Sequence, residues 1–330
     1  MHLSLIIPVF NRPAEVESLL ESLRHQTDHD FETVIVEDGS DDDCRQIVDR
    51  FRGKLSIHYH WKTNSGPGLT RNFGCTKASG DYFIFLDSDC VLPPHYISAV
   101  RRQLTVEYTD AFGGPDAAME DFTALQRAIN YSMTSFFTTG GIRGGSEKLE
   151  KFHPRSFNMG FSKTVFTRTG GFSSLRFGED IDMSVRILKA GFRTQLIRDA
   201  YVYHRRRTNL RRFFKQVYNS GIARINLNFR HPGTLKPVHT APALFTVGTF
   251  AILMLSILVS SYYILPLSAY TSVIFIDAWM RNGSLKIGLL AIVASYVQLI
   301  GYGLGFLYAS FKRYVMGKGE FAAFQKSFYK

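Results

Sequence analysis

The sequence predicts an α/β domain followed by amphipathic helices and then by transmembrane helices. Over the first 86 residues, apolar runs of strand length alternate with segments whose apolar residues recur at helical spacing. Two later stretches, 241–280 and 287–309, are almost free of charged residues, and a strongly basic segment, 198–236, lies just before them. We therefore expect a sheet domain, a membrane-interface segment and a membrane region, in that order along the 330 residues.

The first part of the chain should form a parallel sheet covered by helices. Strands are expected at 3–10, 31–37, 55–61 and 82–86. Helices are expected at 14–24, after the acidic residues 41–43, and at 69–78. Strands that alternate with helices in this way lie parallel in one sheet, and ligands of such sheets bind at its carboxyl edge. The loops that follow the strands are therefore the expected site.

The fourth strand ends in two carboxylates one residue apart, Asp87 and Asp89. Two nearby carboxylates repel each other, and a divalent cation would offset that repulsion. Mg²⁺ or Mn²⁺ is the hard cation that such oxygen ligands suit, and a nucleoside diphosphate could complete its coordination. A solvated acidic turn is the alternative, which the preceding buried strand disfavours.

A second acidic cluster contains Glu179, Asp180 and Asp182. Ordered segments are expected around it and before it, with helices at 124–137 and 183–190, ordered structure at 157–161 and 164–172, and a strand at 192–198. Carboxylates at the start of a helix can simply cap it, because the helix dipole favours them there. Three acids in four residues beside an expected sheet edge instead favour a site that performs chemistry.

The basic segment 198–236 holds ten Lys and Arg residues against a single acid, Asp199. Within it, 208–229 interleaves cations with aromatic and aliphatic residues, which is typical of one or two amphipathic helices at a membrane surface. Nucleic acid is another partner for such cations, but the chain has no recognised reading motif, and the adjacent apolar region favours anionic lipid. A solvated surface helix is the remaining alternative.

The two apolar stretches have the length of membrane spans. Residues 241–280 suit two crossings, with a hinge near Ser260-Ser261 or Pro266, and 287–309 supply a third. The topology stays open, because basic residues on both sides of the third stretch favour the cytoplasmic side: Arg281, Lys286, Lys312 and Arg313. Three crossings leave the basic tail outside, whereas a re-entrant or in-plane segment would remove the conflict.

Three cysteines, Cys44, Cys75 and Cys90, are too few and too scattered for a disulfide framework or a zinc cluster. A reducing compartment is therefore expected. The N-terminal residues 1–13 are apolar but brief and lack a basic flank, so they are interpreted as a first strand and not as a signal peptide. We expect an integral membrane protein whose sheet domain lies on the cytoplasmic side.

In these motifs and in their order, the chain resembles glycosyltransferase family 2, in the membrane-attached, bacterial-type branch with the GT-A fold. The resemblance covers about residues 3 to 230. It rests on LIIPVFNR, VIVEDGSDD, NSGPGLTRNFG, GDYFIFLDSD and FGEDIDMSVRILKAGF. Together these motifs are specific to the family, whereas a DxD motif alone is not.

The resemblance implies roles for residues on the donor side. Pro8 and the segment Phe10–Arg12 would border the nucleotide base, and Asp38 would hydrogen-bond the uracil ring, so that a UDP-sugar is the favoured donor. Arg71, in the RN.G helix of the family, would approach the nucleotide. Glu37 departs from the family pattern, because many members carry Asp there, and the nucleotide-base preference stays open.

The resemblance also implies a metal site and a general base. Asp87 and Asp89 match the metal-binding motif, with Asp89 as the expected direct ligand of the ion that bridges the diphosphate. His204 is a further candidate for the metal or diphosphate site, or else an ordinary structural histidine. Asp180 matches the general base of inverting members, with Glu179 as the second candidate or as a group that orients the acceptor.

These roles predict an inverting, metal-dependent glycosyltransferase that moves a sugar from a nucleotide-diphosphate donor to a lipid-linked or membrane-associated acceptor in cell-envelope glycan biosynthesis. A non-catalytic nucleotide-sugar-binding scaffold or partner subunit is the alternative. It is disfavoured because binding alone requires no base. The basic belt Arg205–Lys215 would bind anionic lipid, or clamp the pyrophosphate of a lipid-linked acceptor. The expected division is a catalytic domain at 1–204, an interface segment at 205–236 and a transmembrane region at 237–330.

Overall fold

A computed structural model describes residues 1–117, 122–140, 153–204 and 208–324. The chain divides into two compact units. The first unit is formed by Met1–Met119 and Leu149–Arg205, and the second by Glu120–Lys148 and Arg206–Lys330. The described residues 122–140, which the sequence-based division keeps within 1–204, fall in the second unit.

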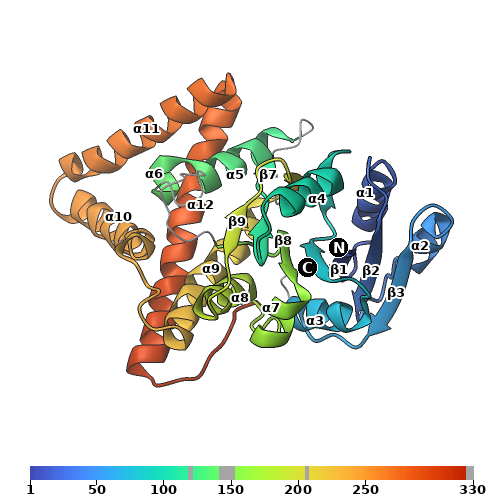
Figure 1. Ribbon diagram of the computed structural model, residues 1–330. Coiled ribbons are helices and arrows are strands. Elements are labelled where there is room, and N and C mark those ends of the chain that lie inside the picture. The colour runs from blue at the N-terminus through green and yellow to red at the C-terminus, as the bar shows by residue number, and fades with distance from the viewer. Residues whose placement is uncertain (118–121, 141–152, 205–207, 325–330) are drawn as a thin grey trace. The chain divides into compact units, whose positions relative to one another are not determined.

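The first unit is built on a seven-stranded sheet with the order β3-β2-β1-β4-β8-β6-β9 (Figure 1). Four of its strands are parallel and match those expected from the sequence: β1 (Leu3–Val9), β2 (Phe31–Asp38), β3 (Ile57–Lys62) and β4 (Tyr82–Leu86). The intervening helices are α1 (Pro13–Arg24), α2 (Arg45–Phe51) and α3 (Pro67–Lys77). The carboxyl ends of the parallel strands therefore share one edge.

The other half of the sheet runs differently from a purely parallel arrangement. Strand β8 (Asn158–Ser162) is antiparallel to both β4 and β6 (Ala111–Gly113), and β9 (Thr194–Leu196) is parallel to β6. The sheet is therefore mixed. The start of β8 pairs with the end of β4, Asn158 with Leu86, which brings residues around 155–158 to the edge where β4 ends.

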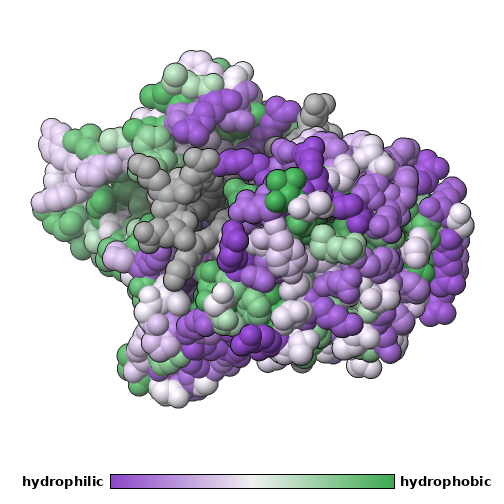
Figure 2. Space-filling view, in the orientation of Figure 1, coloured by the Kyte–Doolittle hydropathy of each residue, from purple (hydrophilic) through white to green (hydrophobic). Residues whose placement is uncertain are grey.

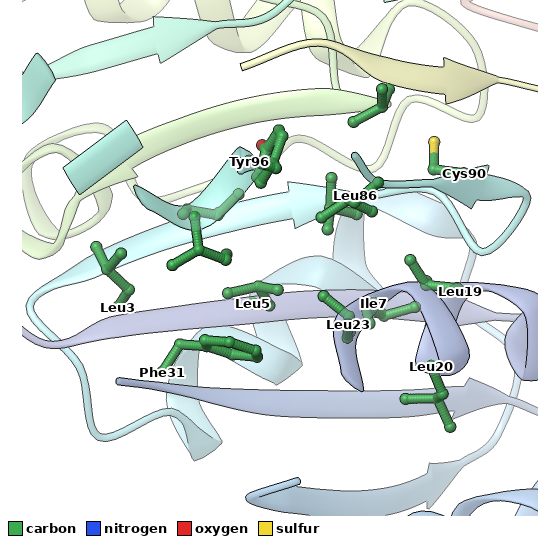
Figure 3. Close-up of a cluster of buried hydrophobic side chains, with 14 of the residues drawn as sticks. Leu3, Leu5, Ile7, Leu19, Leu20, Leu23, Phe31, Leu86, Cys90 and Tyr96 are labelled. Carbon is green, nitrogen blue, oxygen red and sulfur yellow. The ribbon is translucent and has the colours of Figure 1, made fainter. Parts of the chain in front are cut away.

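The core of the first unit lies on both faces of this sheet. Alternate residues of β1 point to opposite faces: Leu5 and Ile7 pack with α1, whereas Ile6 packs on the side of α3. Figure 3 shows Leu5 and Ile7 beside Leu19 and Leu23 of α1. Helix α4 (Tyr96–Val106) covers the same face as α1, while α7 (Lys163–Thr169) and α8 (Glu179–Lys189) cover the opposite one.

A small three-stranded sheet joins three distant segments of the first unit. Its central strand, β10 (Val202–His204), pairs with β5 (Cys90–Val91) on one side and with β7 (Asp116–Ala117) on the other. This pairing holds the chain directly after Asp89 in place.

The second unit is helical. Its elements are α5 (Ala124–Thr134), α6 (Phe136–Thr139), α9 (Leu210–Arg230), a 3-10 turn η1 (Pro237–His239), α10 (Ala241–Leu258), a second 3-10 turn η2 (Ser261–Ile264), α11 (Leu265–Asn282), α12 (Leu285–Ser310) and a π-helical turn η3 (Phe311–Val315). The helix expected at 124–137 is broken at Ser135, whose extended backbone ends α5 and whose side chain caps α6. Segment 208–229 forms one helix, α9.

Three helices of the second unit are long and apolar enough to cross a membrane: Ala241–Leu258, Ser261–Asn282 and Leu285–Val315. The turn between the first two falls at Ser260 and Ser261, where the sequence predicts a hinge. Apolar residues gather on the surface of this unit over α10 and α11 (Figure 2).

Candidate active site

The candidate site begins where strand β4 ends. All five residues of β4 are buried, and the chain then turns to place Asp87 and Asp89 at the edge of the sheet. The Asp87 side chain is 34% exposed and that of Asp89 is 12% exposed. The apolar run thus anchors two acids at a partly open position, as the sequence predicts.

Arg71 links the acids of β4 to those of α8. It lies on α3 and is buried, and its guanidinium stands over the ring of Phe172 at 5.4 Å. One terminal nitrogen donates to Oδ1 of Asp87 at 2.7 Å, and the other donates to Oε1 of Glu179 at 3.0 Å. Two acidic motifs that lie far apart in the sequence are therefore joined by one buried cation.

Glu179 and Asp180 begin α8 and are both buried. Burial and then the charge of Asp180 raise the pKa of Glu179 to about 7. Burial alone would also raise the pKa of Asp180, but the charge and hydrogen bond of Arg155 outweigh it and hold that pKa below its usual value. Asp180 therefore stays ionised at neutral pH, whereas Glu179 holds its proton more tightly than an ordinary carboxyl group.

Both oxygens of Asp180 accept hydrogen bonds. Nε of Arg155 donates to Oδ2 at 2.6 Å, and the backbone N–H of Ile181 donates to Oδ1 at 2.8 Å. Arg155 is 42% exposed, and its charge is also felt by Asp116 of β7. This arrangement fixes the orientation of the carboxylate and keeps it charged.

Arg12 contacts Asp89. Its Nη1 donates to Oδ2 of Asp89 at 2.5 Å, so that the residue expected to border a nucleotide base meets the acid motif. Arg12 stands at the N-terminus of α1, and Phe10 and Pro8 precede it at the carboxyl end of β1, each half-buried. The segment 8–12 therefore lies at the same sheet edge as Asp89.

Asp38 organises the loop before α3. Its Oδ1 accepts from Nζ of Lys62 at 2.5 Å and from the N–H of Ser65 at 2.8 Å, and its Oδ2 accepts from the N–H of Gly66 at 2.9 Å. Close packing here also requires Gly39, which has a φ of +74°, and at which a Cβ would lie 2.8 Å from the backbone nitrogen of Asn64. The loops after β2 and β3 are thereby tied together.

Glu37 faces the opposite side of β2 from Asp38. It accepts from the N–H of Cys44 at 2.8 Å and from the hydroxyl of Ser40. These bonds shape the chain between β2 and α2. The Glu that departs from the family pattern is thus engaged with its own loop.

The residues present fit a divalent cation that is shared with a ligand. Asp87 and Asp89 supply hard carboxylate oxygens of the kind that Mg²⁺ and Mn²⁺ prefer. Within the described residues, however, no group of three or more His, Cys, Asp or Glu side chains could hold a metal. An ion bound here would need further oxygens from the diphosphate and from water. The backbone of His204 pairs with Cys90, the residue after Asp89, which places His204 in the strand next to the motif.

Three charged residues at this edge were not singled out from the sequence: Lys62, Asp116 and Arg155. Lys62 ends β3, so the rule that sites follow strands could have found it. Asp116 and Arg155 carry no motif signal, because a two-residue strand and a short irregular segment position them. Arg205–Arg207 of the expected belt lie outside the described residues; Arg211 and Arg212 are exposed, whereas Lys215 is buried.

Comparisons with known proteins agree with this architecture. The family model described as "Glycosyl transferase family 2" matches residues 4–177. An uncharacterized glycosyltransferase of Haemophilus influenzae is 29% identical over 194 residues, which are 57% of this chain and 62% of that protein. The GalNAc(5)-diNAcBac-PP-undecaprenol beta-1,3-glucosyltransferase of Campylobacter jejuni is 32% identical over 116 residues, which are 34% of this chain and 37% of that protein.

A solved structure shares the fold. The mannosyltransferase PcManGT from Pyrobaculum calidifontis, in complex with GDP-Man and Mn²⁺, superposes with a TM-score of 0.64 at 16% identity, covering 89% of this chain and 86% of that one. The fold is therefore of the GT-A type. The alignments with the two curated relatives span less than two thirds of their lengths.

Proposed function

Since the chain belongs to glycosyltransferase family 2, we propose that it is an inverting glycosyltransferase that acts at a membrane surface. The observation that supports this best is the chain of contacts from Asp87 through Arg71 to Glu179, with the ionised Asp180 beside it. Such an arrangement supports the proposal, because the acid proposed to bind the donor and the acid proposed as the base belong to one charged cluster. Binding of a nucleotide sugar without transfer would need no ionised acid of this kind.

The proposed chemistry is a single displacement. The acceptor hydroxyl attacks the anomeric carbon, its proton passes to an oxygen of Asp180, and the bond from that carbon to the diphosphate oxygen breaks on the opposite face. One such displacement inverts the configuration of the sugar. Arg155 keeps Asp180 charged before the proton arrives, and Glu179 is proposed to orient the acceptor.

The donor end of the site is proposed to hold a nucleotide diphosphate. Asp87 and Asp89 would hold Mg²⁺ or Mn²⁺, which offsets the negative charge that develops on the leaving phosphate. Asp38 and the segment 8–12 would lie beside the nucleotide. The family resemblance favours uridine, whereas the structural neighbour binds GDP-Man, so both donors must be tested.

A lipid-linked acceptor is proposed because of the apolar helices of the second unit. The Campylobacter relative is named as a glucosyltransferase for an undecaprenol-linked acceptor, in agreement with this substrate class. Cytoplasmic placement of the first unit is part of the proposal and is supported by its three free, buried cysteines, which suit a reducing compartment.

The test is a transfer assay in membranes that contain the chain, with UDP- and GDP-sugars, a divalent metal and extracted lipid as acceptor. Asp180→Asn should abolish transfer and leave nucleotide binding intact. Asp199→Asn, the same chemical change at an exposed ion pair with Arg102, should leave transfer unchanged. Full activity of Asp180→Asn would refute the assignment of the base.

The scaffold alternative makes the opposite prediction in the same assay. Donor binding with neither transfer nor hydrolysis, for every donor and lipid fraction, would favour it. Transfer that persists in excess chelator would remove the metal role from Asp87 and Asp89 but would leave the enzyme assignment in place.

A further inference from the structure

Helices α10 and α11 form a hairpin that projects from the second unit. Only the first half of α10 has buried residues, Ala243, Thr246 and Thr249, and α11 contacts the rest of the unit from Tyr270 onward, with Ile274 and Ala278 buried. The turn between the helices lies away from α12 (Figure 1). The projecting half of the hairpin has no partner within the described residues that would cover its apolar side chains.

The tip of this hairpin carries no charged residue, and its exposed side chains are apolar apart from the serines and tyrosines of the turn, Ser260–Tyr263. Ile257 is 80% exposed, and Leu258, Val259 and Leu265 are exposed as well. The sequence holds no charged residue from 241 to 276, while Lys236 and Arg281 stand at the two ends of the hairpin. A turn that emerged into water would gain from charged residues, so this composition favours a tip within hydrocarbon.

The projecting part matches one leaflet in length. From Phe250 to the end of α10 at Leu258 it measures about 14 Å, at about 1.5 Å per residue. The hydrocarbon core of a bilayer is about 30 Å thick, so half of it is about 15 Å. The hairpin can therefore bury its exposed residues without crossing the membrane.

Helix α12 is lined by α9 along its C-terminal half. A Cβ at Gly305 would lie 2.0 Å from the backbone oxygen of Tyr218, and one at Gly221 would lie 2.2 Å from that of Tyr302. Further along, the rings of Phe229 and Tyr314 are 4.7 Å apart. The two helices thus run in the same direction, in contact at least from Gly301 of α12 to Tyr314 of η3.

Helix α9 is unsuited to the hydrocarbon core. Arg211 and Arg212 are exposed at its start, and Arg224 follows on its second half. The interval 213–223 measures only about 16 Å, and it contains Lys215 and Asn219. Because the cations Arg212 and Arg224 bound this interval, which is shorter than the hydrocarbon core, α9 cannot span the core without carrying one of them into it, and the part of α12 beside it is expected to lie outside the core too. Residues 285–300, which remain, measure about 24 Å, less than the core thickness.

The tail after α12 returns to α9. The N–H of Ala323 donates to Oδ1 of Asn219 at 2.9 Å, and Nδ2 of Asn226 donates to the backbone oxygen of Phe321 at 2.8 Å. Glu320 accepts two hydrogen bonds from Arg230, at 2.8 and 3.2 Å. Buried amides and an ion pair therefore hold the tail on the same side of any membrane as α9.

We propose that the second unit enters the membrane from one side only: the α10–α11 hairpin dips into one leaflet, and α9, α12 and the tail 317–324 all stay on the side of entry. The partner is a lipid bilayer with anionic headgroups at the base of the hairpin. Arg281, Lys286, Lys312 and Arg313 then share one side, which removes the conflict that three crossings create. The inference rests on the membrane attachment in the proposed function.

Single cysteines and a membrane-impermeant maleimide test this arrangement in right-side-out and inside-out vesicles of cells that express the full chain. The native Cys44, Cys75 and Cys90 are buried, so the unmodified chain should label only after denaturation, which also reports correct folding. The exposed positions to vary are Thr208→Cys before α9, Ser261→Cys at the tip and Lys318→Cys in the tail.

We expect Thr208→Cys and Lys318→Cys to label from the same side, and Ser261→Cys to label from neither side until the vesicles are dissolved in denaturing detergent. Labelling of Lys318→Cys from the side opposite Thr208→Cys would mean an odd number of crossings and would overturn the proposal. Labelling of Ser261→Cys from that opposite side would mean that the hairpin crosses, which also overturns it. Recovery of the folded chain in the soluble fraction would instead refute membrane attachment itself.

Discussion

Glu179 and Asp180 are adjacent, but the pKa of Glu179 is raised whereas that of Asp180 is lowered. Burial raises the pKa of both carboxyl groups, and a neighbouring cation lowers each one to a different extent. Arg155 hydrogen-bonds directly to Asp180, whereas Arg71 shares its charge between Glu179 and Asp87. A pair of carboxyls whose pKa values are pushed apart is suited to two different tasks in one reaction. Arg155, which touches neither Asp87 nor Asp89 by any described hydrogen bond, is proposed as a positioning residue.

Replacement of Arg155 tests this role through the pH dependence of transfer. In Arg155→Met the effect of burial on Asp180 is no longer offset, so its pKa should rise and the acidic limb of the rate profile should move to higher pH. We expect transfer at neutral pH to fall about tenfold or more. Arg155→Lys keeps the positive charge, so it should retain more activity than Arg155→Met. The acidic limb of its rate profile should also move by less. An unchanged profile in both variants would contradict the assignment of Asp180 as the base.

Glu32 carries a separate prediction about stability. It is buried and accepts from the Ser4 hydroxyl at 2.5 Å and from the N–H of Ser79 at 2.6 Å. Burial would raise its pKa, but these hydrogen bonds outweigh burial and lower the pKa below the ordinary value of 4.5. The ionised form therefore stabilises the fold above pH 4.5, and this stabilisation is lost as the pH falls through the lowered pKa.

Glu32→Gln should accordingly destabilise the first unit by about 1–3 kcal/mol at neutral pH. Thermal unfolding followed from neutral pH to a pH well below 4.5 should show a smaller pH dependence than that of the unmodified chain. An equal loss on acidification in both proteins would show that other carboxyl groups carry the effect.

At the scale of elements, α9 and α12 are held together by backbone contact. Glycines at 221, 301 and 305 allow this approach, because any side chain there would meet the opposite helix. Sequence periodicity indicates that both segments are helical, but it does not show that one covers the other. The same limit applies to β8: its residues predict an ordered segment, whereas its antiparallel direction depends on where the chain re-enters the sheet.

Gly305→Val should force α9 and α12 apart and destabilise the second unit by about 1–3 kcal/mol or more, as overpacking does elsewhere. Gly248→Val is the matched control, since a Cβ at Gly248 meets nothing within 4 Å. Melting temperature and monodispersity in one detergent measure both variants. If the two variants unfold alike, the contact between α9 and α12 is not close.

At the scale of the whole molecule, the uncovered apolar hairpin and the exposed cations are expected to bind the membrane through different interactions. The apolar contact should survive salt, whereas attraction of Arg211 and Arg212 to anionic headgroups should weaken as salt is added. We expect the chain to stay with membranes in high salt and at alkaline pH, and to be released by detergent. Release by salt alone would show that the hairpin is not inserted.

The sequence by itself determined the parallel half of the sheet, the acids at its carboxyl edge and the position of the apolar helices. These features depend on local patterns: apolar runs of strand length, turns after them, and charge-free stretches. The break at Ser135 and the grouping of residues 122–140 with the C-terminal helices were not visible in those patterns.

Only the tertiary structure decided which cation meets which acid. Arg71 and Glu179 are 108 residues apart, and Arg155 and Asp180 are 25 apart, so no periodic signal connects them. The acidities of Glu179 and Asp180 follow from burial and from charges within a few ångströms, which exist only once the chain is folded. The return of the tail to α9 is likewise a contact in space, and it supports the proposed one-sided membrane arrangement, which charge counting left open.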